Sequence, residues 1–242
     1  MTPGVGGADG GTAAVAVWVK TPGRSPVKTR LAAAVGRARA EAFYARAVRA
    51  VEAVVRAAAD ALGKGALVPY WAVAEPEPEA AAGWRGFATV AQGGGGLGER
   101  QARVYDALRA RHARVLFIGT DSPQMPPEIL VDAARRLAPG TDGTDFVVGP
   151  AEDGGYYLFG GRLPLPRAVW TEVPYSTPGT LAALRPRLAA HGRVAMLPML
   201  FDVDTVHEFA RLGGALAARG TALLPAQRAL LEWLASSAAG AT

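Results

Sequence analysis

An aspartate stands directly after the most clearly defined apolar segment of the sequence. Residues 114–118 are typical of a buried strand, and Gly119, Thr120 and Asp121 follow them. An ionised carboxylate in that position must be hydrated, paired or bound to a metal ion, and magnesium in proteins prefers one or two carboxylates together with substrate phosphate oxygens. Asp121 is therefore a candidate metal ligand, and the alternative is that it caps the helix that follows.

Two further carboxylates occur where a later apolar segment gives way to a helix. Asp202 and Asp204 alternate in the sequence Phe-Asp-Val-Asp-Thr at 201–205, so in an extended segment their side chains would share one face. They are a second source of metal ligands. Alternatively, Asp204 or Thr205 caps the last long helix, and capping and metal binding could coexist.

Four cationic side chains lie close together after the first apolar run. Residues 13–19 are followed by Lys20, Arg24, Lys28 and Arg30, which include two of the three lysines in the chain. We expect a helix to begin near the end of this loop, and helix N–H groups combined with Lys and Arg form a site for phosphate oxygens. The alternative is an exposed basic turn. The sequence lacks the Gly-x4-Gly-Lys-Ser/Thr pattern of P-loop nucleoside triphosphatases, so a protein of that class is not expected.

A turn rich in glycine could approach a ligand closely. Asp153, Gly154, Gly155 and Tyr156 follow one another in the segment 149–158. Adjacent glycines let the backbone come near a bound molecule, and a tyrosine beside them can stack on a sugar or a base. The alternative is a tight turn with tyrosines in the core.

Strand and helix patterns alternate along the chain. Strands are expected at 13–19, 66–74, 114–118, 145–148, 156–159 and 194–197, and a further short strand is expected to end at Gln92. Helices are expected at 29–62, 98–112, 127–137, 178–190 and 206–219. This order predicts an α/β fold with a mostly parallel sheet, whose ligands bind at the carboxyl ends of the strands. Pro69 suggests a position near the sheet edge for its strand, and 75–79 reads as a surface loop. We expect a flexible tail at 1–12, one domain at 13–220, and a C-terminal helix and tail at 221–242.

Composition narrows the functional classes. The 242 residues are 50% hydrophobic and 19% charged and include no Cys, which argues against disorder, thiol catalysis and Cys-ligated metals. The net charge of +5 comes almost entirely from arginines, many in alanine-rich helical stretches, so we expect solvated helix surfaces and no nucleic-acid partner. No apolar stretch approaches the roughly 20 residues of a membrane-spanning helix, and no secretory signal pattern is present. We expect a cytoplasmic protein.

Four short motifs together resemble one bacterial protein family. They are Val-Lys-Thr-Arg-Leu at 27–31, Gly-Thr-Asp-Ser-Pro at 119–123, Gly-Pro-Ala-Glu-Asp-Gly-Gly-Tyr-Tyr-Leu at 149–158 and Asp-Val-Asp-Thr at 202–205. In this order they are similar to GT-A-fold transferases that are named glycosyltransferases, some of them arsenosugar-biosynthesis or radical-SAM/selenodomain-associated transferases. The resemblance covers about residues 13–215. It implies a single-domain nucleotide-diphospho-sugar transferase fold with a mostly parallel central sheet flanked by helices.

The start of the chain also resembles the phospholactate guanylyltransferases. These share a Lys and then Lys-Thr/Ser-Arg-Leu after the first strand, which points towards nucleotidyl transfer. Two departures matter: Ser25 and Pro26 lengthen the usual turn, and Gly95 and Gly96 stand where an acidic Gly-Asp is expected before Leu-Gly-Glu-Arg at 97–100. A role for that acidic residue is therefore not transferred from the family to this sequence.

These resemblances imply roles for particular residues. The nucleotide and its phosphates are expected to contact Lys20, Arg24, Lys28, Arg30, Gln92, Gly119 and Thr120. A divalent cation, Mg or Mn, is expected on Asp121 with one or both of Asp202 and Asp204. Asp121, Lys28 and Asp153 are the expected catalytic residues, and the acceptor is expected near Gly154, Gly155, Tyr156, Glu99 and Arg100.

Three activities remain open, and the first is favoured. A glycosyltransferase would take a sugar from a nucleotide-diphosphate sugar and pass it to a small-molecule acceptor. A guanylyl- or cytidylyl-type nucleotidyltransferase would join a nucleoside triphosphate to a phosphorylated acceptor and release pyrophosphate. A non-catalytic protein would keep only the nucleotide site.

Overall fold

The first apolar run lies at the centre of a sheet because its residues alternate between two buried faces. Ala13, Val15 and Val17 pack into one hydrophobic cluster, and Ala14 and Ala16 pack into another on the opposite face. This computed structural model describes residues 11–76, 78–141 and 143–239. The expected tail at 1–12 therefore lies almost entirely outside the described residues.

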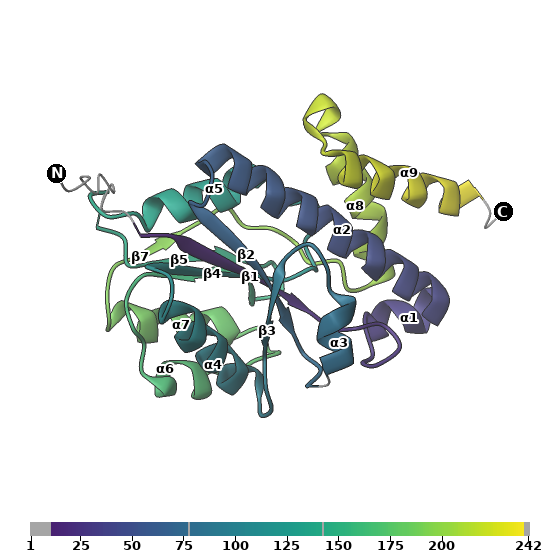
Figure 1. Cartoon of the computed structure of the whole chain (residues 1–242). Helices are drawn as coiled ribbons and strands as arrows, with labels where there is room; N and C mark the ends of the chain where they lie inside the picture. The colour runs from purple at the N-terminus through teal and green to yellow at the C-terminus, as the bar shows by residue number, and fades with distance from the viewer. Residues whose placement is uncertain (1–10, 77, 142, 240–242) are drawn as a thin grey trace.

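Seven strands form a single sheet in the order β3-β2-β1-β4-β6-β5-β7 (Figure 1). Their bounds are β1 Ala13–Val19, β2 Leu67–Val73, β3 Ala88–Ala91, β4 Arg114–Ile118, β5 Phe146–Pro150, β6 Tyr156–Gly161 and β7 Val194–Met196. Every neighbouring pair is parallel except the two pairs that involve β6, which runs antiparallel between β4 and β5. The prediction of a mostly parallel α/β sheet is confirmed.

Helices cover both faces of this sheet (Figure 1). One face is covered by α2 (Arg37–Leu62) and α5 (Pro127–Arg136), and the other by α4 (Leu97–Arg109), α6 (Arg167–Thr171) and α7 (Thr180–Ala189). The short helix α3 (Pro78–Gly83) lies between β2 and β3. Each face therefore has its own apolar core, as expected for crossovers between parallel strands.

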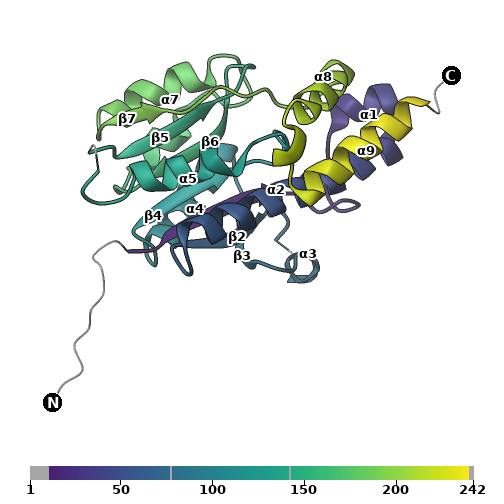
Figure 2. The same ribbon diagram turned by 90° about the horizontal axis from the view of Figure 1, so that it is seen from above.

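A third cluster lies beside the sheet. It joins α2 to α1 (Thr29–Val35), α8 (Val206–Ala217) and α9 (Pro225–Ala239), with a 3-10 turn at Gly220–Ala222 between the last two helices (Figure 2). Phe43 of α2 makes an edge-on contact with Phe209 of α8, with 4.8 Å between ring centroids. This cluster fixes the segment 201–205, which leads into α8.

Two local features differ from the sequence-based expectations, and the position of Pro69 near the sheet edge agrees with them. The expected helix at 29–62 is two helices, because Gly36 takes φ 82° between α1 and α2. Pro69 lies in β2, which is not the outermost strand, but β3 pairs only with 70–73, so Pro69 has a neighbouring strand on one side alone. Glu75 is buried, with 7% of its surface exposed, although the segment 75–79 was expected to be a surface loop.

The register of the strands brings distant residues to one edge of the sheet. Val17 pairs with Ile118 at the end of the ladder between β1 and β4, so the loops that carry Lys20 and Asp121 leave the sheet at the same edge. Because β6 runs antiparallel to β4, its first residues reach the same edge, where Gly119 N–H donates to the Tyr157 carbonyl oxygen at 3.3 Å. A parallel bridge between Ala151 and Leu200 places the segment that carries Asp202 beside the turn that follows β5. The carboxyl edge therefore collects the predicted functional residues.

Two helical glycines provide a matched test of this packing. A Cβ on Gly98 in α4 would overlap the carbonyl oxygen of Trp170 in α6 and lie 2.9 Å from the Tyr175 ring, whereas a Cβ on Gly214 in α8 meets nothing within 4 Å. We expect Gly98→Ala to lower the free energy of unfolding by about 1–3 kcal/mol through overpacking. Gly214→Ala should raise it by about 0.5–1 kcal/mol through helix propensity.

Urea unfolding of both variants and the parent chain measures these changes. Equal stabilisation of the two variants would show that α4 does not pack closely against α6.

Candidate functional site

A buried lysine connects the three segments that meet at the carboxyl edge. The Lys28 ammonium group donates to Asp121 Oδ1, to the Val203 carbonyl oxygen at 2.7 Å and to Asp204 Oδ1 at 3.1 Å. The Lys28 side chain is only 3% exposed, whereas the side chains of Asp121 and Asp204 are 48% and 38% exposed. The two carboxylates thus face both the lysine and solvent.

Electrostatics favour the charged form of this lysine. Burial lowers the pKa of Lys28, but the negative charges and hydrogen bonds of Asp121 and Asp204 outweigh burial and hold it above its ordinary value. All three ammonium protons have acceptors on the protein. These contacts use the donors of Lys28 in this conformation, and its expected contact with phosphate stays a prediction.

The segment 201–205 is fixed to the loop after β4 by backbone and side-chain contacts. Val203 N–H donates to the Asp121 carbonyl oxygen at 2.8 Å, and Gln124 Nε2 donates to the Phe201 carbonyl oxygen at 2.6 Å. Gln227 of α9, which is fully buried, donates to the carbonyl oxygens of Pro123 and Met125. Asp121 and Asp204 are therefore positioned by backbone that is itself anchored.

Asp202 lies in the same segment but has a different environment. Its Oδ1 accepts a hydrogen bond from Ser122 Oγ at 2.6 Å. Burial is the main cause that raises the pKa of Asp202 to about 7, and the nearby negative charges of Asp121 and Asp153 add to the shift. Asp202 is thus close to two other carboxylates and ionises only near neutrality.

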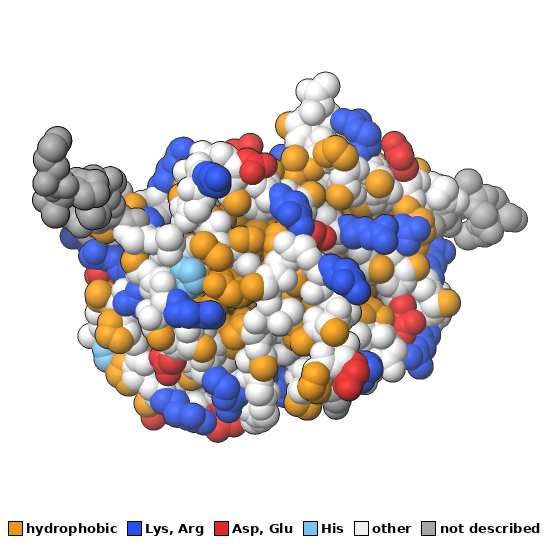
Figure 3. All heavy atoms as spheres, in the orientation of Figure 1, with side chains coloured by type: hydrophobic (Ala, Val, Ile, Leu, Met, Phe, Trp, Pro, Cys, Tyr) orange, Lys and Arg blue, Asp and Glu red, His pale blue; other side chains and the backbone are white. Residues whose placement is uncertain are grey.

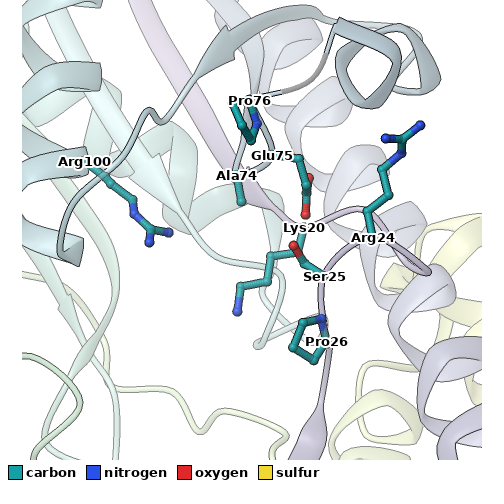
Figure 4. A pocket seen from close by; sticks show the side chains of 8 residues that line it. All are labelled: Lys20, Arg24, Ser25, Pro26, Ala74, Glu75, Pro76 and Arg100. Atoms are coloured by element: carbon teal, nitrogen blue, oxygen red, sulfur yellow. The ribbon is translucent and has the colours of Figure 1, made fainter.

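A pocket of about 510 Å³ opens beside this group (Figure 4). Its lining residues are Lys20, Arg24, Ser25, Pro26, Ala74, Glu75, Pro76 and Arg100. The Lys20 and Arg100 side chains point towards each other across it, whereas the Arg24 side chain points away from them. The structure therefore brings together Lys20 and Arg100, which the sequence analysis assigned to different subsites.

Glu75 supports this pocket and was missed by the sequence analysis. Its carboxylate accepts hydrogen bonds from Thr21 N–H at 2.9 Å and from Thr21 Oγ1 at 2.8 Å. Burial alone would raise its pKa, but the hydrogen bonds from Ser25 and Thr21 bring it below the ordinary value. The available signal was its position just beyond β2, one residue further from the strand than Lys20 is from β1.

The glycine-rich turn has a structural explanation. Gly154 has φ 89°, and a Cβ there would collide with the Pro178 carbonyl oxygen. Gly155 N–H donates to Asp153 Oδ1 at 2.8 Å, which closes the turn and leaves Asp153 exposed. Gly154 is thus required by the turn and by its packing against the segment before α7.

Tyr156 packs into the core beside this turn. Its hydroxyl donates to Gln101 Oε1 of α4 at 2.7 Å, its ring packs against the cluster under α4 and α6, and burial raises its pKa well above the ordinary value. This packing is that of the alternative interpretation, a core tyrosine beside a tight turn, and the acceptor contact stays a prediction.

The other predicted residues differ in their availability. Gln92 is buried and donates to the Ala72 carbonyl oxygen at 2.8 Å, so it joins strands. Glu99 caps α4 at the Gly96 N–H and pairs with Arg167 at 2.8 Å; the N–H and Arg167 lower its pKa. Thr120 is buried, and the Arg30 side chain is 73% exposed, with Nη1 3.9 Å from Asp204 Oδ2.

Of the three carboxylates proposed as metal ligands, two converge in the structure. Among the described residues, no group of three or more His, Cys, Asp or Glu side chains is arranged to hold a metal ion. Asp121 and Asp204 converge on one point, which the Lys28 ammonium takes, and Asp202 is directed towards Ser122. Any metal bound here would need further oxygen ligands from substrate or water.

Charge on the surface is dispersed on the face seen in Figure 3. There, Lys and Arg side chains alternate with acidic and apolar groups and form no continuous band. In α2, Arg37 and Arg56 pair with glutamates one turn away. Within the part of the chain that the structure describes, no helix has both the length and the apolar character to cross a membrane.

The sequence matches one known protein family. Residues 54–177, just over half of the chain, match the family model described as "Uncharacterized protein conserved in bacteria (DUF2064)". The chain belongs to this family. The DUF2064 match includes Glu75, Arg100 and Asp121, whereas Lys20, Lys28 and Asp204 lie outside it. No protein of curated function matches the sequence.

A solved structure shares the fold of this DUF2064 protein, and two others show a weaker likeness. A crystal structure of a "putative nucleotide-diphospho-sugar transferase" from Desulfovibrio desulfuricans G20 is 26% identical, with a TM-score of 0.70 over 92% of this chain and 97% of that chain. CMP:2-keto-3-deoxy-manno-octonic acid synthetase complexed with CTP has 13% identity and a TM-score of 0.47, over 86% and 99% of the two chains. Glucosyl-3-phosphoglycerate synthase from Mycobacterium tuberculosis has 14% identity and a TM-score of 0.46, over 79% and 70%.

The pKa of Asp202 predicts a pH-dependent effect on stability. The pKa rises from 3.8 to about 7 on folding, so the folded chain holds this proton more tightly and loses the associated stability as pH rises towards 7. We expect Asp202→Asn, which can still accept from Ser122, to unfold at higher urea concentration than the parent near pH 8. The two proteins should become equally stable near pH 4. A difference that does not change with pH would contradict the buried environment of Asp202.

Proposed function

We propose that this chain is a metal-dependent glycosyltransferase that uses a nucleotide-diphosphate sugar as donor. The observation that carries the proposal is that the loops after the parallel strands β1 and β4 bring a cationic pocket lined by Lys20 and the two carboxylates that Lys28 bridges to one edge of the sheet. Ligands of open α/β sheets bind outside the carboxyl ends of the strands. The 26% identical structure, whose name is "putative nucleotide-diphospho-sugar transferase", supports a donor of this class.

The pocket suits the phosphates of a nucleotide. Lys20 and Arg100 offer cationic donors from opposite walls, and Arg24 adds charge from the rim. A volume of about 510 Å³ is within the usual range for small-ligand sites. The contribution of these residues is to bind and orient the diphosphate, with Glu75 holding the loop that carries Lys20.

A hard divalent cation fits the donor set of the adjoining group. Asp121 and Asp204 present carboxylate oxygens to one point, and both are partly open to solvent. Mg²⁺ and Mn²⁺ take carboxylate, water and phosphate oxygens, and the sequence contains no Cys to select a softer metal. When bound, such a cation supplies charge neutralisation for the leaving phosphate oxygens.

An acceptor would approach from the side of the glycine-rich turn. Asp153 is exposed, and its charge acts on Asp202, so the two carboxylates lie near each other. In glycosyl transfer, the acceptor hydroxyl oxygen forms a bond to the sugar carbon as the bond to the diphosphate oxygen breaks. The hydroxyl proton passes to a base, and Asp153 is our candidate for that role.

Nucleotidyl transfer is the second candidate, and the cationic pocket favours it specifically. Lys20, Arg24 and Arg100 provide three positive charges, which suits a triphosphate. The acceptor phosphate oxygen would then attack the α-phosphorus and release pyrophosphate. A non-catalytic nucleotide-binding role is the third, and the exposure of Asp121 beside the pocket argues against it.

A screen with added Mg²⁺ or Mn²⁺ distinguishes these functions. Purified protein is incubated with nucleotide sugars and with nucleoside triphosphates, each with pooled small-molecule acceptors, and consumed species are identified by mass spectrometry. We expect release of a nucleoside diphosphate from a nucleotide sugar. Release of pyrophosphate from a triphosphate would replace the glycosyltransferase proposal with the nucleotidyltransferase.

Asp121→Asn tests the proposed metal ligand. Removing one negative charge from the cation site should lower turnover by about 100-fold or more, because charge on the leaving phosphate is no longer balanced. Asp60→Asn is the matched control, since Asp60 is exposed near the C-terminus of α2, which leads to the opposite edge of the sheet. Initial rates at saturating metal measure both variants. Equal rates for Asp121→Asn and the parent would exclude Asp121 from catalysis.

Lys20→Ala tests the phosphate pocket. Loss of a charge-assisted hydrogen bond should weaken nucleotide binding by about 10- to 100-fold. Lys64→Ala removes the same charge from the exposed loop before β2, at the other edge of the sheet, and should leave binding unchanged. Calorimetric titration with the nucleotide found in the screen measures the affinities. Equal weakening by both variants would indicate a general charge effect and contradict a local pocket.

A further inference from the structure

Lys28 is fully engaged by the protein at the point where a cation is proposed to bind. Its three ammonium protons are directed to Asp121, to the Val203 carbonyl oxygen and to Asp204, and its side chain is almost completely buried. The Phe43 ring, with its centroid 5.9 Å from Nζ, covers it from α2. No donor of Lys28 remains for a phosphate while these contacts hold.

The backbone of Lys28 is also unusual. It has φ 47° and ψ 46°, in the left-handed region that side chains other than glycine rarely adopt, and within the described chain only Ser176 among other non-glycine residues has positive φ. Such a conformation costs free energy and persists only where the surroundings enforce it. The hydrogen bonds of the ammonium group to Asp121 and to the segment with Val203 and Asp204 hold Lys28 in this conformation.

The ammonium group and a divalent cation would compete for the same position. Asp121 Oδ1 and Asp204 Oδ1 both lie within hydrogen-bond distance of one nitrogen, so the same two oxygens can reach one metal ion after a small inward movement. Mg²⁺ requires oxygens at about 2.0–2.1 Å. A positive charge already held there repels the metal ion strongly because the site is partly shielded from water.

We propose that Lys28 is an internal counter-ion that occupies the divalent-cation position between Asp121 and Asp204 until substrate phosphate draws its ammonium group away. Metal binding then requires displacement of Lys28, and the displaced ammonium group pairs with the phosphates that arrive with the metal. Metal and nucleotide therefore bind cooperatively, and each raises the affinity for the other by the same factor. Lys28 acts as a positioning residue in the free protein. The inference rests on the cation site of the proposed function.

Metal titration without nucleotide tests this role directly. Free Mn²⁺ is followed by electron paramagnetic resonance for the parent chain, Lys28→Met and Lys28→Gln. Both substitutions remove the charge and keep a linear side chain with the same backbone requirement, and Gln can still donate to a carboxylate. We expect both variants to bind Mn²⁺ at least about tenfold more tightly than the parent.

Two controls show whether the gain arises at this position. Lys28→Met/Asp204→Asn removes one of the two competing oxygens and should lose the gain, whereas Lys64→Met should match the parent. A second readout is the rise in melting temperature on adding Mn²⁺, which should be larger for the two Lys28 variants. A merely structural role for Lys28 would weaken metal binding when the residue is replaced.

The proposal is overturned if neither variant binds Mn²⁺ more tightly, or if the gain survives in the double variant. The proposal is also overturned if a variant folds so poorly that added Mn²⁺ does not restore its circular dichroism spectrum. A vacated cation site should be stabilised by the metal ion. These outcomes are separate from the activity screen. A gain in Mn²⁺ affinity without any turnover would uphold the role of Lys28 and contradict only the proposed function.

Discussion

The buried ammonium group of Lys28 is the interaction on which the arrangement of this site depends. It joins the loop after β1 to the loop after β4, 93 residues away in the sequence, and to the segment before α8, 176 residues away at Asp204. A charge removed from water is costly unless its partners satisfy it, and here two carboxylates and a carbonyl group do so. Because Val203 also donates to the Asp121 carbonyl oxygen, the two acidic segments are held together by backbone as well as by charge.

The order and direction of the strands determine which residues meet at this edge. The loops after the adjacent parallel strands β1 and β4 leave the sheet at the same edge, and Glu75, which follows β2, accepts a hydrogen bond from the loop that carries Lys20. The antiparallel strand β6 starts at the same edge, so the turn with Asp153 lies near Asp202. Cationic groups thus gather over the β1–β2 side and carboxylates over the β4–β5 side. A phosphate-bearing donor and its acceptor would meet between them.

Local patterns predicted the strands well, and the side-chain network much less. The runs at 13–19 and 114–118 form β1 and β4 with the expected ends, because continuous apolar sequence leaves few other structures. The division of the first helical region at Gly36 depends on a single positive φ. Whether Lys28 contacts a phosphate or two carboxylates, and whether Tyr156 faces a ligand or α4, depends on partners far away in the sequence. Spacing alone does not encode such contacts.

The central claim is that a divalent cation and a nucleotide diphosphate share this edge. The most direct measurement is a crystal structure of the protein with Mn²⁺ and a nucleoside diphosphate, with manganese located by its anomalous signal. The account predicts a manganese peak between Asp121 and Asp204, with the diphosphate against Lys20 and Arg100 and the Lys28 ammonium group moved from its present position. A nucleotide bound elsewhere, or a manganese peak away from Asp121 with Lys28 still bridging the two carboxylates, would contradict it.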